Sequence, residues 1–243
     1  MRPDKKLMTV DSAKKLLEAI DPVIAVAGKT GSFILELSPD TIQSKVKDEA
    51  SVMVCYMTAT MTGIDYTIPA DMSTIEIPIR PAVDALHVFG SDEVTISLSA
   101  MNEIVISNDE GRRRAFRVLK AGTPARYIKC TPEAECDIPP GKLQELAGLE
   151  RIDETVHFSV REGRLSVIAQ SDTESDEISI PTSLLTDQAS AYAAEYLTSV
   201  IRRIHTDDDV HLGYSTAGLL KLTFSYEDAV SYEVLIAPRV ERD

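Results

Sequence analysis

The chain has 243 residues, of which 44% are hydrophobic and 26% are charged, and its 39 acidic side chains outnumber its 25 lysines and arginines to give a net charge of −14. This mix is typical of a folded globular protein, and no apolar run reaches the about 18 residues that a membrane-spanning helix needs, so we exclude a disordered chain and expect no membrane partner. The acidity also excludes nucleic-acid binding by the surface as a whole, although a local basic surface is compatible with it.

The cysteines indicate the compartment. Cys55, Cys130 and Cys136 are odd in number, which rules out a complete disulfide framework. A reducing environment is therefore expected. Residues 1–6 are followed by no apolar signal-peptide core. We therefore expect a cytoplasmic protein.

The first predicted unit begins with a strand at residues 7–10, after which Asp11 and Ser12 offer an N-cap for a helix. Because proline in a helix interior removes a hydrogen bond, we expect Pro22 to end this helix. Strands rich in β-branched residues follow; they are predicted at 33–37, 41–46 and 51–58. The helix carries apolar residues at i, i+3, i+4 and i+7, which form one stripe: Ala13, Leu16, Leu17 and Ile20.

The second predicted unit follows a less regular span, residues 61–73, in which we place a short strand at 66–68. A strand at 75–79 leads into a helix at 81–89, since proline is tolerated in the first turn, and Gly90 ends that helix. The helix repeats the apolar stripe with Ala82, Ala85, Leu86 and Phe89. Strands are predicted at 94–98, 103–107 and 115–119, and residues 109–111 form a hairpin turn between the last two.

Residues 121–132 break this rhythm with two prolines, a glycine and no apolar period, which predicts a linker. Tyr127 and Ile128 are large apolar side chains of a kind that a free linker seldom carries. We therefore expect this connector to lie against a surface.

Two further units are predicted after the linker. A strand at 135–138 leads through Pro139, Pro140 and Gly141 into a third helix, whose stripe consists of Leu143, Leu146 and Ala147. Strands follow at 156–160, 165–169 and 177–180, and residues 162–163 form a tight turn between the first two. A fourth helix at 194–204 presents Leu197, Val200, Ile201 and Ile204 to a core and leaves Glu195, Thr198, Ser199, Arg202 and Arg203 on the other side. Strands at 210–214, 219–225 and 230–236 complete the chain.

The predicted elements therefore repeat. Helices begin near residues 12, 81, 141 and 194, each after a short strand and before several strands, with two such units on each side of the linker. Each helix has one apolar stripe, so we expect each to pack on a sheet and to leave its other face bare.

Two regions carry a family resemblance. Residues 13–20, Ala-Lys-Lys-Leu-Leu-Glu-Ala-Ile, are similar to the first helix of the proliferating cell nuclear antigen (PCNA) family, the DNA sliding clamps of archaea and eukaryotes. Residues 196–197, 210–212 and 219–224 resemble the C-terminal part of the family, and the ending Leu235-Ile236-Ala237-Pro238-Arg239-Val240-Glu241 resembles a fairly specific signature of it. The order of predicted elements matches the family over nearly the whole chain.

The resemblance implies an α+β fold with two similar clamp-type domains, each of two βαβββ units with helices on one face of antiparallel sheets. We place the domains at residues 1–120 and 134–243, with an interdomain connector at 121–133. It implies that three chains close into a ring around duplex DNA. It also implies no catalysis and no cofactor, since a clamp holds DNA polymerase and other replication and repair enzymes on DNA, is loaded by a clamp loader, and binds short peptides of its partners under the connector.

Cations on the helices are the DNA-binding candidates, because mobile lysine and arginine side chains contact phosphates without regard to sequence. By position they are Lys14, Lys15, Arg80, Lys142, Arg202 and Arg203, with Arg112, Arg113 and Arg114 near the hole or the ring joint. Each could instead belong to an ordinary solvated helix face.

The chain departs from the family pattern in that the hole is expected to be less positive than usual. The positions that carry other residues where the family commonly has basic ones are Asp21, Asp84, His87, Glu145 and Gly148. Either DNA is held weakly, or the chain is a specialised or hetero-oligomeric clamp subunit.

The resemblance also assigns a peptide-binding surface, which suits a helical peptide with aromatic anchors. Its residues are Val52, Val54, Tyr127, Ile128, Leu219, Leu235, Ala237 and Pro238. The aliphatic members could instead be plain core residues of their strands. Lys47 stands near the rim, where the family often has an apolar residue.

Ring closure in the family pairs an edge strand of one subunit's first domain with an edge strand of the neighbour's second domain. Here those strands are expected at 113–119 and 176–180. The interface candidates are Arg113, Phe116, Val118, Glu177, Ile178 and Ile180.

An enzyme would need a catalytic constellation, and the sequence shows none. The histidines His87, His157, His205 and His211 have no metal-ligand spacing with the cysteines. Residues 207–209, three aspartates, could hold a divalent cation but more naturally form a solvated turn. The rival to a DNA clamp is a clamp-shaped scaffold that binds proteins and no longer grips a duplex.

Overall fold

The computed structural model describes residues 4–28, 31–61, 73–99, 101–123, 126–182, 188–205, 209–214 and 218–239. The chain forms two compact units, one made of Met1–Val46 with Tyr56–Arg126 and the other of Lys47–Cys55 with Tyr127–Asp243. Local sequence patterns do not reveal that Lys47–Cys55 packs with the second unit, because its contacts there are with residues far along the chain. The short strand predicted at 66–68 lies outside the described residues.

The elements follow one another in the order strand, helix, strand, strand, strand, and this order occurs four times. The predicted α+β fold built from βαβββ units is therefore confirmed. In the described part of the chain, no helix has the length and hydropathy needed to cross a bilayer.

The first unit contains two antiparallel arrangements of strands. One sheet has the order β1-β6-β7-β8, in which β7 pairs with both β6 and β8. In the other, β2 pairs with both β5 and β3, and β4 comes next in the sheet order. The strands are β1 (Lys5–Val10), β2 (Ser32–Leu37), β3 (Thr41–Lys47), β4 (Met53–Thr60), β5 (Thr74–Pro78), β6 (Val94–Leu98), β7 (Glu103–Ser107) and β8 (Arg113–Arg117).

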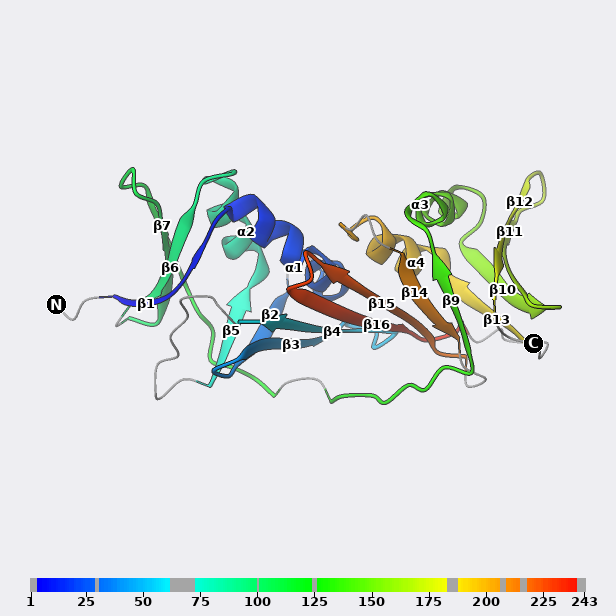
Figure 1. Cartoon of the computed structure of the whole chain (residues 1–243), viewed down its shortest axis with the longest axis horizontal. Helices are drawn as coiled ribbons and strands as arrows, with labels where there is room; N and C mark the ends of the chain where they lie inside the picture. The colour runs from blue at the N-terminus through cyan, green and yellow to red at the C-terminus, as the bar shows by residue number, and fades with distance from the viewer. Residues whose placement is uncertain are drawn as a thin grey trace. The chain divides into compact units, whose positions relative to one another are not determined.

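Helices α1 (Ala13–Ala27) and α2 (Ile79–His87) lie side by side in this unit (Figure 1). The stripe predicted for α2 is confirmed for Ala82, Ala85 and Leu86, which are buried. The helix ends at His87 and not at 89 as predicted, and Phe89 is buried beyond it. Off this stripe, Asp84 and His87 are exposed.

The prediction that Pro22 ends the first helix was wrong. The helix continues through Pro22 to Ala27 and ends at Gly28, whose φ of 75° is in the left-handed region. A proline inside a helix costs a hydrogen bond, but Val23 and Val26, which lie beyond it, are 0% and 2% exposed. Burial of this last turn offsets the lost bond.

The second unit repeats the arrangement. One sheet has the order β12-β11-β10-β13, and in the other β14 lies between β15 and β9, with β16 next to β15. The strands are β9 (Ala134–Ile138), β10 (Thr155–Arg161), β11 (Arg164–Gln170), β12 (Ser175–Pro181), β13 (Gln188–Ala193), β14 (Val210–Tyr214), β15 (Leu220–Tyr226) and β16 (Val230–Ile236). Glu162 and Gly163 turn β10 into β11 with φ values of 50° and 73°, as predicted.

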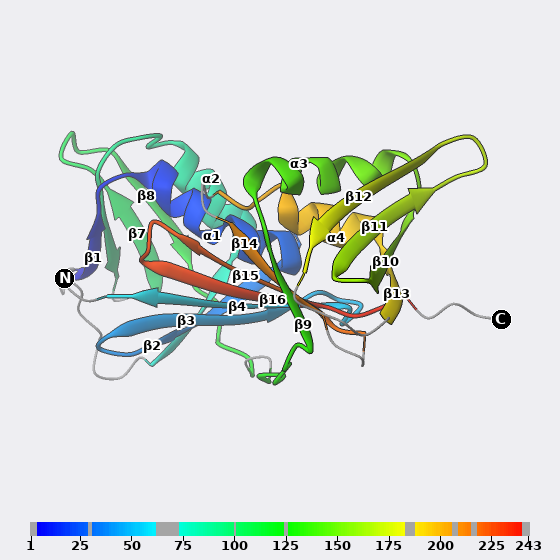
Figure 2. The same cartoon turned by 45° about the vertical axis from the view of Figure 1, so that its right-hand side comes forward.

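Helices α3 (Pro140–Gly148) and α4 (Ala194–Ile201) pack against each other, with a 3₁₀ turn, η1 (Leu149–Arg151), after α3. Figure 2 shows the two helices side by side. The fourth helix was expected to reach Ile204 but ends at Ile201, and Ile204 lies half-buried beyond it. Thr198 was expected on the bare face but is 1% exposed, because its hydroxyl donates to Glu150 Oε2 at 2.8 Å.

A short strand was expected before the fourth helix but was given no bounds, and the structure shows it as β13. Its sequence, Gln-Ala-Ser-Ala-Tyr-Ala, has little intrinsic strand propensity. It becomes a strand because it pairs with β10 along its length, from Thr155 opposite Ala193 to Val160 opposite Gln188.

Candidate functional site

Cations on the helices of the first unit have acidic neighbours. Lys14 Nζ lies 3.6 Å from Glu18 on α1, and Arg80 Nε lies 3.9 Å from Asp84 on α2. The Lys14, Arg80 and Asp84 side chains are at least two-thirds exposed. Such surface pairs add little stability, but each carboxylate reduces the positive potential that a phosphate would meet.

The second unit repeats this pairing. Lys142 Nζ bonds to Glu145 on α3. Arg202 Nη2 lies 2.8 Å from Glu150 Oε2 and 3.3 Å from the Ala147 carbonyl oxygen. Glu150 also accepts the Thr198 hydroxyl, so it joins the end of α4 to η1. No sequence pattern pointed to Glu150, because it lies far from α4 along the chain.

The structure thus places Lys14, Lys15, Arg80 and Arg202 on exposed positions of helices or helix ends, with Lys142 and Arg203 half-buried. Among the described residues, at least four of these six cations have a carboxylate within 4 Å: Lys14, Arg80, Lys142 and Arg202. Arg112 is drawn toward the end of α2, where Nη1 donates to the Val88 carbonyl oxygen at 2.7 Å.

The predicted peptide-binding residues all belong to the second unit. The loop that carries Val52 is shaped by Asp48, which is 9% exposed and whose carboxylate accepts the backbone N–H groups of Ala50 at 3.1 Å and Met53 at 2.6 Å. The C-terminal tail runs beside this loop, because the Ala237 N–H donates to the Val52 carbonyl oxygen at 2.8 Å. The structure therefore brings Val52 and Ala237 together.

Gly218, which precedes Leu219, lies close against Pro238. At Gly218 a Cβ would come within 2.8 Å of Pro238 Cγ, and the backbone φ is 80°, so glycine alone fits this close approach. Tyr192 donates its hydroxyl to the Gly218 carbonyl oxygen at 2.6 Å, which fixes the turn before Leu219.

The connector is held by a polar cluster that the sequence analysis missed. Tyr127 donates its hydroxyl to the Glu233 carboxylate at 3.3 Å, and Lys221 Nζ lies 2.7 Å from Glu233 Oε2. Partial burial raises the pKa of Tyr127, and the Glu233 charge raises it further. Lys221 and Glu233 are diagonal neighbours across β15 and β16, a cross-strand charge pair that the predicted hairpin could have revealed.

The eight predicted peptide-binding residues differ in accessibility. Tyr127 and Ile128 are 57% and 42% exposed, whereas Val54 and Leu235 are 7% and 2% exposed. The other four are half-buried: Val52, Leu219, Ala237 and Pro238. Val54 and Leu235 therefore belong to the core, and the other six residues are at least partly accessible. Lys47 is exposed beside this surface and bonds to Ser51 Oγ at 3.1 Å.

The predicted joint residues lie on or next to two edge strands, β8 and β12. Arg113 and Glu177 are exposed, and Phe116 and Val118 are half-buried. Ile178 and Ile180 are only 3% and 2% exposed, so their side chains belong to the core of their own unit.

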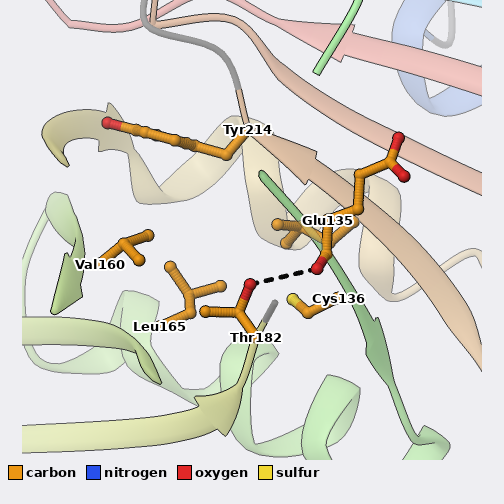
Figure 3. A pocket seen from close by; sticks show the side chains of 7 residues that line it. Glu135, Cys136, Val160, Leu165, Thr182 and Tyr214 are labelled. Atoms are coloured by element: carbon orange, nitrogen blue, oxygen red, sulfur yellow. Dashed lines mark hydrogen bonds between the residues drawn. The ribbon is translucent and has the colours of Figure 1, made fainter. Parts of the chain in front are cut away.

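A small hollow of the second unit is shown in Figure 3. Near it, Thr182 donates its hydroxyl to the Glu135 carbonyl oxygen at 3.1 Å, which ties the end of β12 to β9. The side chains that line it are largely apolar: Glu135, Cys136, Val160, Leu165, Thr182, Leu212 and Tyr214. These seven side chains form an apolar packing region and do not form a catalytic arrangement of acid, base and nucleophile.

The cysteines are also unsuited to nucleophilic chemistry. All three are buried, and none forms a disulfide in the described part of the chain. Burial raises the pKa of Cys55 to about 12 and that of Cys136 to about 11, so both stay protonated at neutral pH, and the thiolate is the reactive form. Within the described residues, no group of three histidine, cysteine or acidic side chains could hold a metal ion.

Comparisons with known proteins show a likeness in structure. No protein-family model matches the chain, and a sequence comparison with curated proteins finds no match. Among solved structures, Archaeoglobus fulgidus PCNA with the C-terminal region of FEN-1 bound matches with a TM-score of 0.85 at 13% identity, over 98% of this chain and 100% of that one.

Two further structures match over similar spans. PCNA from Thermococcus kodakaraensis has a TM-score of 0.83 at 18% identity, covering 97% of this chain and all of its own. A chain of the Sulfolobus tokodaii PCNA2–PCNA3 complex has a TM-score of 0.80 at 15% identity, covering 96% and 99%. With its fourfold repeat of βαβββ units and these matches over nearly its whole length, this protein has the fold of a PCNA-type sliding clamp.

Proposed function

We propose that the protein is a DNA sliding clamp, a processivity factor that encircles duplex DNA and holds DNA polymerase and other replication and repair enzymes on it without catalysing a reaction. The observation that supports this most strongly is the clamp fold over nearly the whole chain. In this proposal three copies form the ring, a clamp loader places it on DNA, and the protein acts in the reducing cytoplasm, which suits three free cysteines.

The helix cations are the proposed DNA contacts: Lys14, Lys15, Arg80, Lys142, Arg202 and Arg203. Long basic side chains contact phosphates without reading sequence, which permits sliding. The carboxylates beside Lys14, Arg80, Lys142 and Arg202 would weaken each contact. Topological linkage by a closed ring keeps the protein on DNA even when these contacts are weak.

The surface formed by Val52, Tyr127, Ile128, Leu219, Ala237 and Pro238 is the proposed docking site for partner peptides, with Val54 and Leu235 beneath it. An apolar floor with exposed residues of an extended connector suits an inserted helical peptide. The A. fulgidus PCNA structure, which has the C-terminal region of FEN-1 bound, supports a partner that docks through its C-terminal region.

Two measurements test the proposal. Light scattering after gel filtration should give a ring-sized trimer, and the loaded protein should raise the processivity of a replicative polymerase on circular primed DNA. Deletion of the clamp-binding peptide from the polymerase is the control and should remove the effect. A stable monomer that forms no complex with related chains would refute the ring.

The second candidate is a clamp-shaped scaffold that binds proteins with little or no grip on DNA, or a subunit of a hetero-oligomer. The paired cations favour it, since at least four of the six DNA candidates have a carboxylate within 4 Å among the described residues. A protein that binds clamp-binding peptides but gives no processivity after loading would favour the scaffold.

A further inference from the structure

The connector carries positive charge in an acidic protein. Residues 120–132 contain Lys120, Arg126 and Lys129 and no aspartate or glutamate, although the whole chain has 39 acidic residues and a net charge of −14. All three basic side chains are exposed. In the part of the chain that the structure describes, none of them has a carboxylate within ion-pair distance. Their charge is therefore available to a partner.

Two of these cations stand beside exposed apolar side chains. Arg126 and Lys129 directly flank Tyr127 and Ile128, which are 57% and 42% exposed. Consecutive Cα atoms lie only about 3.8 Å apart, so a partner that covers Tyr127 and Ile128 must pass next to both cations. A partner chain that continues beyond its apolar anchors meets positive charge on the connector.

The other segments of the proposed docking surface carry cations as well. The loop that holds Val52 also holds Lys47, and Arg239 directly follows Pro238 in the tail; both basic side chains are exposed. Arg239 Nη1 bonds to the hydroxyl of Thr155, a neutral partner that leaves the charge of the guanidinium uncompensated. Three separate segments thus each place an exposed cation close to a docking residue.

The carboxylates of the same segments compensate this charge only in part. Glu233 is held by Lys221 Nζ at 2.7 Å. Asp48 is 9% exposed, and its carboxylate accepts two backbone N–H groups of its own loop. Glu49 and Glu133 are exposed and oppose the cations. The four exposed cations next to docking residues therefore outnumber the exposed carboxylates in the described part of these segments.

We propose that the docking surface selects partner peptides whose apolar anchors are flanked by acidic residues. This inference rests on the proposed function, in which partner peptides dock here, and specifies the charge of the partner. The apolar anchors supply most of the affinity. The cations attract acidic flanks and repel basic ones, because complementary charge speeds encounter and suppresses wrong partners more than it adds affinity.

Single-stranded nucleic acid is the rival occupant, since it also binds exposed cations beside aromatic side chains. Successive bases stack on several aromatic side chains in such sites. Here Tyr127 is the one aromatic residue of the docking surface, and its other members are aliphatic. This composition favours a peptide.

Peptide titrations test the inference. One synthetic clamp-binding peptide is made with flanks of glutamate, lysine or serine, and its binding to the wild-type protein is followed by fluorescence anisotropy. At low salt the glutamate form should bind roughly tenfold more tightly than the lysine form, with the serine form between them, because several exposed charge pairs each contribute a modest amount. The difference should vanish as salt approaches about 1 M, where the Debye length falls to about 3 Å.

Charge reversal identifies the residues responsible. Arg126→Glu with Lys129→Glu should invert the preference, so that the lysine form binds more tightly, and the milder Arg126→Gln with Lys129→Gln should remove most of it. Arg161→Glu with Arg164→Glu is the matched control for the first variant. These exposed arginines lie opposite each other across β10 and β11, so the same charge change leaves a like-charge pair in place there. The control should keep the wild-type preference.

The failures are distinguishable. A wild-type protein that binds none of the three peptides overturns the proposed docking surface itself. Equal binding of the three forms, tighter binding of the lysine form, or a preference that survives about 1 M salt overturns only the charge selection. A single-stranded oligonucleotide that displaces the glutamate form more effectively than the unlabelled glutamate peptide does would assign these cations to nucleic acid and would also overturn the inference.

Discussion

At the scale of single residues, the clearest arrangement is a histidine between two carboxylates. His211 Nδ1 lies 2.8 Å from Asp137, and its Nε2 lies 3.4 Å from Glu135. The hydrogen bond to Asp137 raises the pKa of His211, partial burial opposes this, and Glu135 raises it further. The imidazolium therefore ties β14 to the edge strand β9.

This arrangement predicts a pH-dependent stability. Because the folded pKa of His211 lies above the unfolded value of about 6.5, its contribution is fully present below about pH 6.5 and is lost as pH rises through the folded pKa. His211→Asn should lower the free energy of unfolding by less than about 1 kcal/mol at pH 6, since the site is partly exposed, and by less at pH 8.5. Urea unfolding at both pH values measures the difference, and an equal loss at both would contradict this account.

Tyr127 gives a second residue-scale prediction. Tyr127→Phe removes its hydrogen bond to Glu233 and frees the connector from β16. Stability should change by less than about 1 kcal/mol because the bond is exposed, while the affinity for a clamp-binding peptide should fall roughly two- to tenfold.

Calorimetric titration with such a peptide checks the Tyr127 prediction. Glu233→Gln should weaken binding in the same direction, since it weakens the same anchor. Unchanged affinity in both variants would show that the Tyr127–Glu233 contact does not position the connector.

At the scale of elements, close packing of the connector's Pro132 against β14 fixes where the connector ends. Pro132 lies against Gly213 of β14, where a Cβ would stand 2.4 Å from Pro132 Cγ. At the other end, the Leu119 and Gly122 N–H groups donate to Glu76 of β5. The connector is thus held at each end by the unit it leaves or enters.

Gly213→Ala should destabilise the protein by about 1–3 kcal/mol, because the methyl group overlaps Pro132 and forces the backbone apart. Gly148→Ala is the matched control: Gly148 has helical φ and ψ of −76° and −26°, and a Cβ there meets nothing within 4 Å. It should stabilise by about 0.4–1 kcal/mol. Thermal unfolding of both variants measures this, and similar effects of the two would refute the steric account.

At the scale of the whole molecule, charge is distributed unevenly within a net of −14. The edge strand β8 of the first unit is basic, and the edge strand β12 of the second unit is acidic. The helix cations are mostly neutralised by neighbouring carboxylates. The positive potential available for phosphates is therefore smaller than the number of helix cations suggests.

Neutralising the acidic partners should strengthen DNA binding. With Glu18→Gln, Asp84→Asn and Glu145→Gln together, affinity for duplex DNA at low salt should rise roughly three- to tenfold and the salt dependence should steepen, because more cations become available to phosphates. Glu49→Gln, Glu110→Gln and Glu162→Gln remove the same charge from exposed turns and should have a smaller effect. Equal effects of the two triple variants would show that net charge alone matters.

The sequence by itself determined what depends on local patterns. The apolar stripes of the helices, the alternating strands and the Glu162–Gly163 turn follow from periodicity and turn chemistry, and together they predicted four repeats of a short strand, a helix and several strands. The lack of an apolar period marked the connector, in which Tyr127 and Ile128 were expected to lie against a surface, whereas the structure leaves them 57% and 42% exposed.

Tertiary structure alone decided what depends on contacts between distant residues. Burial of Val23 and Val26 carries α1 past Pro22, pairing with β10 makes β13 a strand, and segment Lys47–Cys55 joins the second unit. Glu150 meets Arg202, and Glu233 meets Tyr127, across 52 and 106 positions of the chain. The physical reason is that periodicity fixes which face of an element is apolar, whereas the partner of a polar or charged side chain depends on which elements the folded core brings together.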